Sequence, residues 1–400
     1  MKKSIVLSLL GASCLLATSA SAVEVKNLDY STNVGVKAFT VNNHTYNVLD
    51  KESSAASVFA DISVKGDLSK DTSFKIRLAG QDSLDAKYSF QGDKKSSASL
   101  VEANVKYHYE NNIITLGRTV FDSPLIYSDN YFAIPNSYDM LSVVNNSLPN
   151  TYLFGGIILR ENKITDLSVD KTVNVNGNFA PIYIAGGLFA GIKEFPVQAW
   201  GYFQENGIAD FSVSTESKFT IDLNLGLQYY FLTNGGMAND KAVTLLGAKV
   251  MYDINEFWDV DIAFSNNSSG SSWNSSANRS NQKTSKVFTS LRGGGQFTGY
   301  DEASVNDTTG FMAKAKGSLD FGELDLAVGS YHHKSGVSYN PTNSSTTHVI
   351  EVDYKTTVFD NVELETTYAY TSYEVANITT PTTNDRKDGH YFGASLNYSF

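Results

Sequence analysis

The amino-acid sequence predicts an all-β protein that forms a transmembrane antiparallel β-barrel of about 18 strands, with 16 as the alternative. Three observations predict this fold: an N-terminal export signal, segments in which apolar and polar residues alternate, and connections that alternate between short turns and long polar loops. Soluble β-proteins also show the alternation, but they have no reason to segregate their loops by length. The combination therefore favours a membrane barrel.

The N-terminus has the pattern of a secretory signal peptide over residues 1–22. Two lysines precede a mostly apolar run from Ile5 to Ala17, and an Ala-x-Ala cleavage site ends at Ala22. The run is shorter than the roughly 20 apolar residues that a spanning helix needs. Cleavage would remove Cys14, the only cysteine, and leave residues 23–400 as a single predicted barrel domain.

Composition fits strands that are apolar on one face. The chain has 23 Tyr, 23 Phe and only seven Pro, as expected where aromatic and β-branched residues fill strands. Loss of the two signal-peptide lysines moves the formal net charge from -11 to -13. Nucleic acid is excluded as a partner, because phosphate binding needs a basic surface.

The clearest strand signal runs from Phe219 to Phe231. Every second residue is apolar, with aromatic residues at both ends and leucines between them, and most residues in between are polar. Thirteen strand residues span roughly 43 Å at about 3.3 Å each, or roughly 30 Å when tilted by about 45°. This length matches the hydrocarbon core of a bilayer, and the aromatic ends match the two interfacial girdles.

The same period of two recurs along the chain, at 58–65, 74–78, 101–109, 258–265 and 362–370. The region from Thr165 to Ser217 has a weaker pattern, and filling it with five strands gives the total of 18. This region is where the count could differ by two.

Connections alternate in length. Short turns are predicted at 66–72, 110–112, 253–257, 319–322 and 356–361, and long polar loops at 42–56, 82–99, 122–150, 266–308, 333–346 and 372–389. With both termini periplasmic, every long loop lies on the outer side, as in outer-membrane barrels. The predicted location is therefore the cell outer membrane, in contact with lipid and lipopolysaccharide.

The last strand alternates up to the terminal Phe400. This ending resembles the C-terminal assembly signal of bacterial outer-membrane proteins, which implies recognition by the barrel-assembly machinery.

A further resemblance lies in the sequence Leu116-Gly117-Arg118 and the residues that follow it, Asp122, Pro124, Leu125, Asp129 and Pro135. This segment resembles one in the OprD-type outer-membrane porin family, and the related major porins of epsilonproteobacteria are similar in length and loop style. The resemblance implies an 18-stranded barrel whose third outer loop, here 122–150, folds inward and narrows the pore. Family members carry an arginine shortly before the proline, whereas this chain has Asn130 to Ile134.

Charged residues near this loop are the candidate pore constriction. Alternation predicts that the basic side chains of β-segment 74–78 face the lumen, opposite the acids of the loop. The candidate residues are Asp122, Asp129, Asp139, Lys75, Arg77, Arg118 and Arg160. The alternative is that the aspartates only cap turns. The acidic loop and the net charge together predict a mild preference for cations.

No pattern of catalytic or metal-binding residues is present. The pair His332-His333 has no nearby ligand set, and the sequence contains neither a nucleophile elbow nor a phosphate-binding glycine loop. The sequence therefore predicts no enzyme activity, no cofactor and no metal.

The leading functional hypothesis is a porin that allows passive diffusion of small hydrophilic solutes and ions. The alternatives are a substrate-specific channel of the same fold, an adhesin or structural barrel that uses the loop 266–308, and an outer-membrane enzyme. The sequence leaves the solutes, the pore size and the choice between monomer and homotrimer open.

Overall fold

The computed structural model places most of the chain in β-strands and their connections. The described residues are 25–42, 54–84, 96–126, 128, 135–162, 169–172, 178–192, 194–233, 242–268, 286–291, 307–334, 344–375 and 386–400. The predicted signal peptide, residues 1–22, lies outside them. Among these residues, no helix has the length and apolar character needed to cross a membrane.

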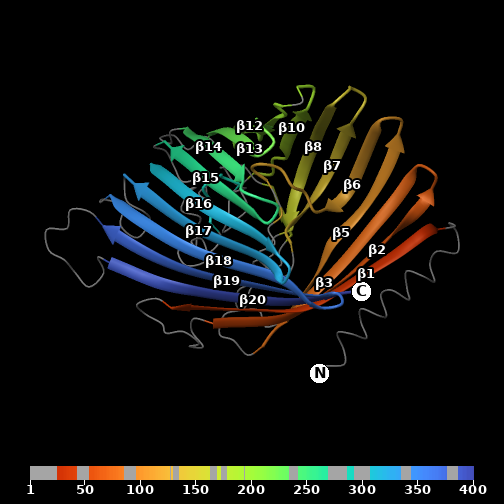
Figure 1. The fold of residues 1–400 in the computed structure, drawn as a ribbon. Coiled ribbons are helices and arrows are strands. Elements are labelled where there is room, and N and C mark those ends of the chain that lie inside the picture. Colours follow the sequence, from red (N-terminus) through yellow and green to blue (C-terminus); the bar gives the residue numbers. More distant parts are fainter. Residues whose placement is uncertain are drawn as a thin grey trace.

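The described strands form one 19-stranded sheet (Figure 1). The first ten are β1 (Lys26–Asn42), β2 (Ser54–Ser69), β3 (Thr72–Ser83), β5 (Ser96–Tyr109), β6 (Asn112–Thr119), β7 (Ser137–Asn145), β8 (Thr151–Asn162), β9 (Val169–Lys171), β10 (Ile182–Phe189) and β11 (Val197–Phe203). The others are β12 (Ala209–Lys218), β13 (Leu223–Leu232), β14 (Val243–Asp253), β15 (Trp258–Asn267), β16 (Thr308–Leu319), β17 (Gly322–His333), β18 (Ser345–Phe359), β19 (Val362–Val375) and β20 (Arg386–Ser399).

Eighteen of these strands close into an antiparallel ring, because β1 pairs with both β2 and β20. The three-residue β9 pairs only with β8, which also pairs with β7 and β10, so β9 is an addition to the ring. Closure pairs β1 on both sides, so the ring has no terminal edge strand. The predicted fold, an 18-stranded antiparallel barrel, is confirmed.

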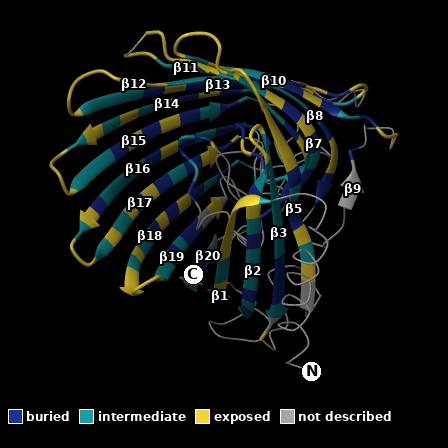
Figure 2. Cartoon of the chain, turned by 90° about the vertical axis from the view of Figure 1, so that its right-hand side faces the viewer, coloured by how far each residue is buried: buried dark blue, intermediate teal, exposed yellow. Residues whose placement is uncertain are grey.

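Buried and more exposed residues form bands along the strands (Figure 2), as expected where successive side chains point to opposite faces of the barrel wall. In β2, Ser57, Phe59, Asp61 and Ser63 are buried, and the residues between them are only partly buried. The outer surface carries large exposed apolar side chains on many strands, for example Leu116, Leu227, Phe311 and Phe392. This outer surface has the composition expected of a lipid-facing wall.

Connections at one end of the barrel are short. Residues 70–71, 110–111, 320–321 and 360–361 link successive strands there. Two of these turns use left-handed residues, Glu110 at φ 52° and Asn361 at φ 66°, as tight hairpins require. Long connections, such as 268–307, lie at the other end. The exception at that end is the short connection 204–208 between β11 and β12.

Three sequence predictions about individual segments were wrong. The region from Thr165 to Ser217 holds three strands of the ring and the short β9 among its described residues, rather than five. The predicted loop 122–150 contains β7 and its turn, so the loop itself covers 120–136. The strand predicted from Phe219 begins at Leu223, because Phe219–Asp222 form a turn in which the Phe219 amide donates to the Leu223 carbonyl at 2.8 Å.

Candidate functional site

Part of the inner wall is apolar. Side chains from β7, β8, β10 and β11 form a buried cluster with residues of the connection that follows β6. The members from these strands include Tyr138, Met140, Phe154, Trp200 and Tyr202. Inward-facing apolar groups must be covered to leave water. The connection after β6 provides the cover.

Residues 120–126 of this third connection lie on the inner wall. The Phe121 ring stacks on Phe154 with centroids 5.0 Å apart and meets Trp200 at 6.3 Å. The Leu125 amide donates to the Tyr202 hydroxyl at 3.4 Å. The connection thus enters the space inside the barrel directly after β6 ends.

A turn fixes the shape of this segment. The Ser123 amide and hydroxyl both donate to the Ile126 carbonyl, at 2.9 and 2.5 Å, and the Ile126 amide donates back to the Ser123 hydroxyl at 3.2 Å. Leu125 and Ile126 are each only 3% exposed. Fully bonded, buried turns are rigid because any movement would leave polar groups unpaired.

A second segment, residues 286–291 of the connection between β15 and β16, also lies on the inner wall. Its Thr289 is held by β15 and β17: the Thr289 and Ser265 hydroxyls are 2.6 Å apart, and the Tyr331 hydroxyl donates to the Thr289 carbonyl at 2.5 Å. The Phe288 ring lies 4.6 Å from the Lys249 ammonium group of β14. These contacts anchor the segment to the inner wall.

The two segments meet at an ion pair. The Lys286 ammonium nitrogen lies 2.6 Å from a carboxylate oxygen of Asp122. The two side chains are 40% and 63% exposed, so solvent reaches both. We call residues 120–126 and 286–291 the inner segments. Their contact joins connections that are 164 residues apart in the chain.

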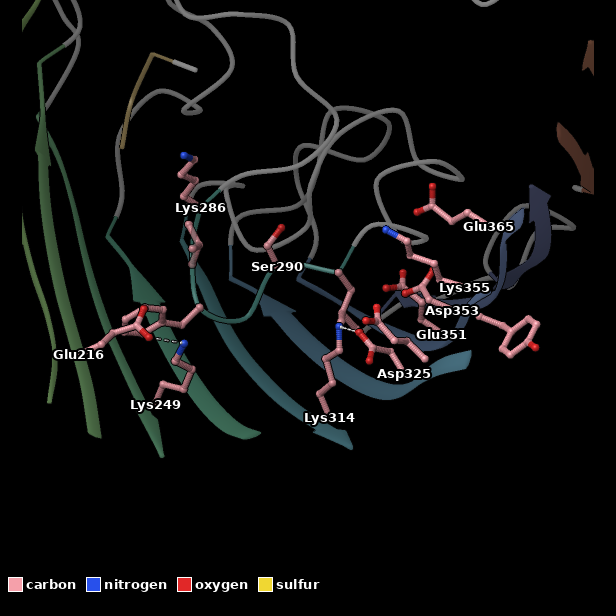
Figure 3. Close-up of a pocket in the computed structure, with 15 residues that line it drawn as sticks. Glu216, Lys249, Lys286, Ser290, Lys314, Asp325, Glu351, Asp353, Lys355 and Glu365 are labelled. Carbon is pink, nitrogen blue, oxygen red and sulfur yellow. Dashed lines mark hydrogen bonds and ion pairs between the residues drawn. The ribbon is translucent and has the colours of Figure 1, made fainter. Parts of the chain in front are cut away.

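A cavity of about 580 Å³ lies between the second inner segment and the wall formed by β12 to β19 (Figure 3). Its charged lining consists of six carboxylates and four lysines: Glu216, Glu323, Asp325, Glu351, Asp353, Glu365, Lys249, Lys286, Lys314 and Lys355. Carboxylates therefore exceed lysines. Figure 3 shows that Glu351, Asp353 and Glu365 gather at one end with Lys355, and that Glu216, Lys249 and Lys286 lie at the other.

Several of these lysines form ion pairs. Lys249 pairs with Glu216 at 3.1 Å, and Lys314 pairs with Asp325. Across the β17–β18 ladder, however, Asp325 lies directly opposite Asp353. Like charges in such positions repel each other. The wall of β17 to β19 is therefore the acidic side of the cavity.

The sequence-predicted Lys75 and Arg77 lie on the other side of the barrel, in β3. Lys75 pairs with Glu102 of β5 at 2.6 Å, and Arg77 pairs with Asp61 of β2 at 2.9 Å. Asp61 and Glu102 are largely buried in the wall. Both cations are therefore neutralised by neighbouring strands rather than directed at the predicted acids.

Arg118 and Asp139 bind each other instead of facing the lumen. The Arg118 guanidinium donates to both carboxylate oxygens of Asp139, at 2.7 and 3.1 Å. Asp139 alternates in β7 with Tyr138 and Met140, which belong to the inner cluster, so the pair lies on the opposite face of the wall. Arg160 stands opposite Asp139 in β8.

Of the predicted constriction residues, the structure thus brings only Asp122 to the contact of the inner segments, and Asp129 lies outside the described residues. Sequence reasoning missed Lys286 and the acidic wall. A signal for the second inner segment exists, because Val287, Phe288 and Leu291 form an apolar island within a polar loop.

No family model and no curated protein matches this sequence. Solved structures do match it: OccAB1 of Acinetobacter baumannii has a TM-score of 0.74 at 12% identity, over 94% of this chain and 97% of that one. OccK8 (OprE) of Pseudomonas aeruginosa has 0.71 at 9%, over 94% and 98%. OpdK of the same organism, solved with vanillate, has 0.69 at 12%, over 93% and 99%. The chain shares its fold with these outer-membrane channels of the OprD family.

Proposed function

We propose that this chain is an outer-membrane porin through which small hydrophilic solutes and ions diffuse passively, with a mild preference for cations. The observation that carries the proposal is the contact between the inner segments. Two connections leave the same end of the barrel, lie on its inner walls and meet at Asp122 and Lys286. Such segments narrow a lumen and set the size and field that a solute meets.

The placement of residues 286–291 favours a channel over an adhesin. An adhesin of this fold would present the connection between β15 and β16 to a partner outside the cell. In its described part, however, this connection contributes Val287 and Leu291 to the inner cluster, and both are 4% exposed. A surface used for adhesion would not be buried inside the barrel.

The preference for cations rests on the cavity lining. Carboxylates outnumber lysines there, and the acidic wall of β17 to β19 faces the second inner segment. Surplus charge of one sign in a narrow passage raises the local concentration of counter-ions. Cations are therefore expected to enter more readily than anions.

Planar-bilayer recording tests the proposal directly. Purified protein should insert with stepwise increases in conductance, and a salt gradient should give a reversal potential of the sign that marks cation preference. A folded barrel that gives no conductance steps would contradict the channel function. A reversal potential of the opposite sign would contradict the cation preference alone.

A substrate-specific channel is the second candidate. The similar channels OpdK and OccK2 (OpdF) were solved with vanillate and glucuronate, respectively. In this chain the charged cavity beside residues 286–291 is the feature that could hold a solute. Saturable block by one solute class in a panel of anionic, cationic and neutral solutes would favour this candidate. Equal, non-saturating passage of all of them would favour the general porin.

Membership of the OprD-type family, together with the related major porins of epsilonproteobacteria, is part of the proposal. Contacts with lipopolysaccharide are a further part of it. Recognition by the assembly machinery through Phe400 is also part of the proposal; the Phe400 residue is 63% exposed, while its backbone exchanges two hydrogen bonds with Thr32, at 2.8 and 3.0 Å, where the ring closes. The homotrimer is testable by the mass of the detergent-solubilised protein.

A further inference from the structure

The barrel wall is incomplete beside the hairpin of β6 and β7. β5 pairs with β6 only from Tyr109 up to Ala103, where Arg118 lies opposite. Beyond this point β5 continues to Ser96 along β3, while the chain after Thr119 turns inward. In the described part of the chain, residues 96–102 therefore have no strand partner on the β6 side. Unpaired backbone groups are unfavourable inside a membrane wall, where no water can bond to them.

Side chains bridge this gap at two points. The Arg118 guanidinium uses one nitrogen to donate to the Leu100 carbonyl of β5 at 3.1 Å and the other two to hold Asp139 of β7. Above it, the Asn162 amide of β8 donates to the Ser99 hydroxyl of β5 at 3.1 Å. Strands β5, β7 and β8 are thus joined over the end of β6. We call these contacts the seam.

The shape of arginine suits this place. Its planar fork can hold a carboxylate with two parallel bonds and still donate to a third acceptor, whereas a lysine ammonium is a point charge. The side chains of Arg118 and Asp139 are only 14% and 24% exposed, so their bonds are partly shielded from water. The Asn104 amide of β5 further donates to the Arg118 carbonyl at 3.0 Å. The backbone of Arg118 is thereby fixed as well.

We propose that Arg118 is a positioning residue that fixes the point where the first inner segment leaves the wall, and so sets the width of the channel without facing the solute. Only three residues separate Arg118 from Asp122, which meets Lys286. If the contacts of the seam shift, the nearby contact between Asp122 and Lys286 moves with them. The statement about channel width rests on the proposed function.

The test measures the position of the inner segment by cysteine labelling. The predicted mature chain lacks cysteine, because the only one is Cys14. Leu125, 3% exposed in the buried turn, is replaced by cysteine, and its reaction with a membrane-impermeant maleimide is followed in folded protein. L125C keeps the Ser123–Ile126 hydrogen bonds and should by itself react slowly.

Adding R118K should speed the labelling of L125C about tenfold, equivalent to about 1.4 kcal/mol of lost packing stability. The substitution keeps the charge but loses the fork. D139N should act in the same direction, because it weakens the same bonds while retaining the size of the side chain. This second variant keeps the test valid if R118K does not fold.

The matched control is D261N, the counterpart of D139N in the Lys316–Asp261 ion pair between β16 and β15, which lie far from the seam in the strand order, so the labelling rate should stay unchanged. Equal labelling rates in R118K, D139N and the parent would overturn the proposal. So would a shift of reversal potential in R118Q without any change in labelling, since that result marks a pore-facing charge. Labelling requires no conductance, so a failure of the channel function would be seen separately.

Discussion

Phe121→Ala tests whether the first inner segment depends on its aromatic anchor. The Phe121 ring is 9% exposed and meets Phe154, Trp200 and Tyr138, with centroid distances of 5.0, 6.3 and 6.5 Å. Truncating a buried phenylalanine to alanine costs about 3–5 kcal/mol. Because the strand ladders hold the barrel independently, we expect this loss to fall on the segment rather than on the wall.

Even about 3 kcal/mol changes an equilibrium more than a hundredfold. Phe121→Ala should therefore release residues 120–126 from the wall for much of the time. Single-channel recording should show larger current noise and altered unitary conductance. Gel mobility with and without heating should show that the barrel still folds.

The control is Phe264→Ala, an equal truncation on the outer surface, where Phe264 is 40% exposed and its ring meets Phe311 at 6.3 Å. This variant should conduct like the parent. If Phe121→Ala folds and its conductance and noise equal those of the parent, the inner segment does not control the channel, and the reasoning from the ring contacts is refuted.

Three further predictions concern charge and backbone. Asp122→Asn or Lys286→Gln should increase current noise at low salt, because either change removes the ion pair that joins the inner segments. An exposed pair contributes less than about 1 kcal/mol, so the difference from the parent should vanish at about 1 M salt, where the screening length is about 3 Å. A difference that persists at high salt would contradict an electrostatic contact. Asp353→Asn should shift the reversal potential towards anion preference more than the control Asp259→Asn does, because Asp353 lines the cavity and Asp259 does not. Equal shifts in the two variants would show that the cavity does not set the ion selectivity. Gly117→Ala should lower the free energy of unfolding by about 1–3 kcal/mol through backbone strain, because Gly117 has a φ of 122° and a Cβ there would meet the Ala103 carbonyl. An unchanged resistance to unfolding by urea would refute this prediction.

The sequence predicted well wherever the barrel faces lipid on one side and water on the other. In β2 and β15 the two solvents impose opposite chemistry on alternate residues, so a period of two appears. Strand prediction from the sequence failed where the inner face of the wall packs against protein inside the lumen. In β7, Tyr138 and Met140 face the first inner segment while Leu141 and Val143 face outward. Both faces are therefore apolar, and the alternation that predicts a strand is lost.

The candidate site was predicted least well, for a different reason. Alternation states which face a residue occupies only after the strand phase is known, and β7, the strand that carries Asp139, was not recognised. Lys286 lies far from Asp122 in the chain, and no local pattern pairs them.

The sequence by itself determined the closed barrel, because hydrophobic alternation and turn length are local properties of the chain. Only the tertiary structure decided which connections lie inside and which charges meet there. Those contacts join segments distant in sequence through packing on an apolar inner wall, whereas Arg118 pairs with Asp139 on the other face of that wall.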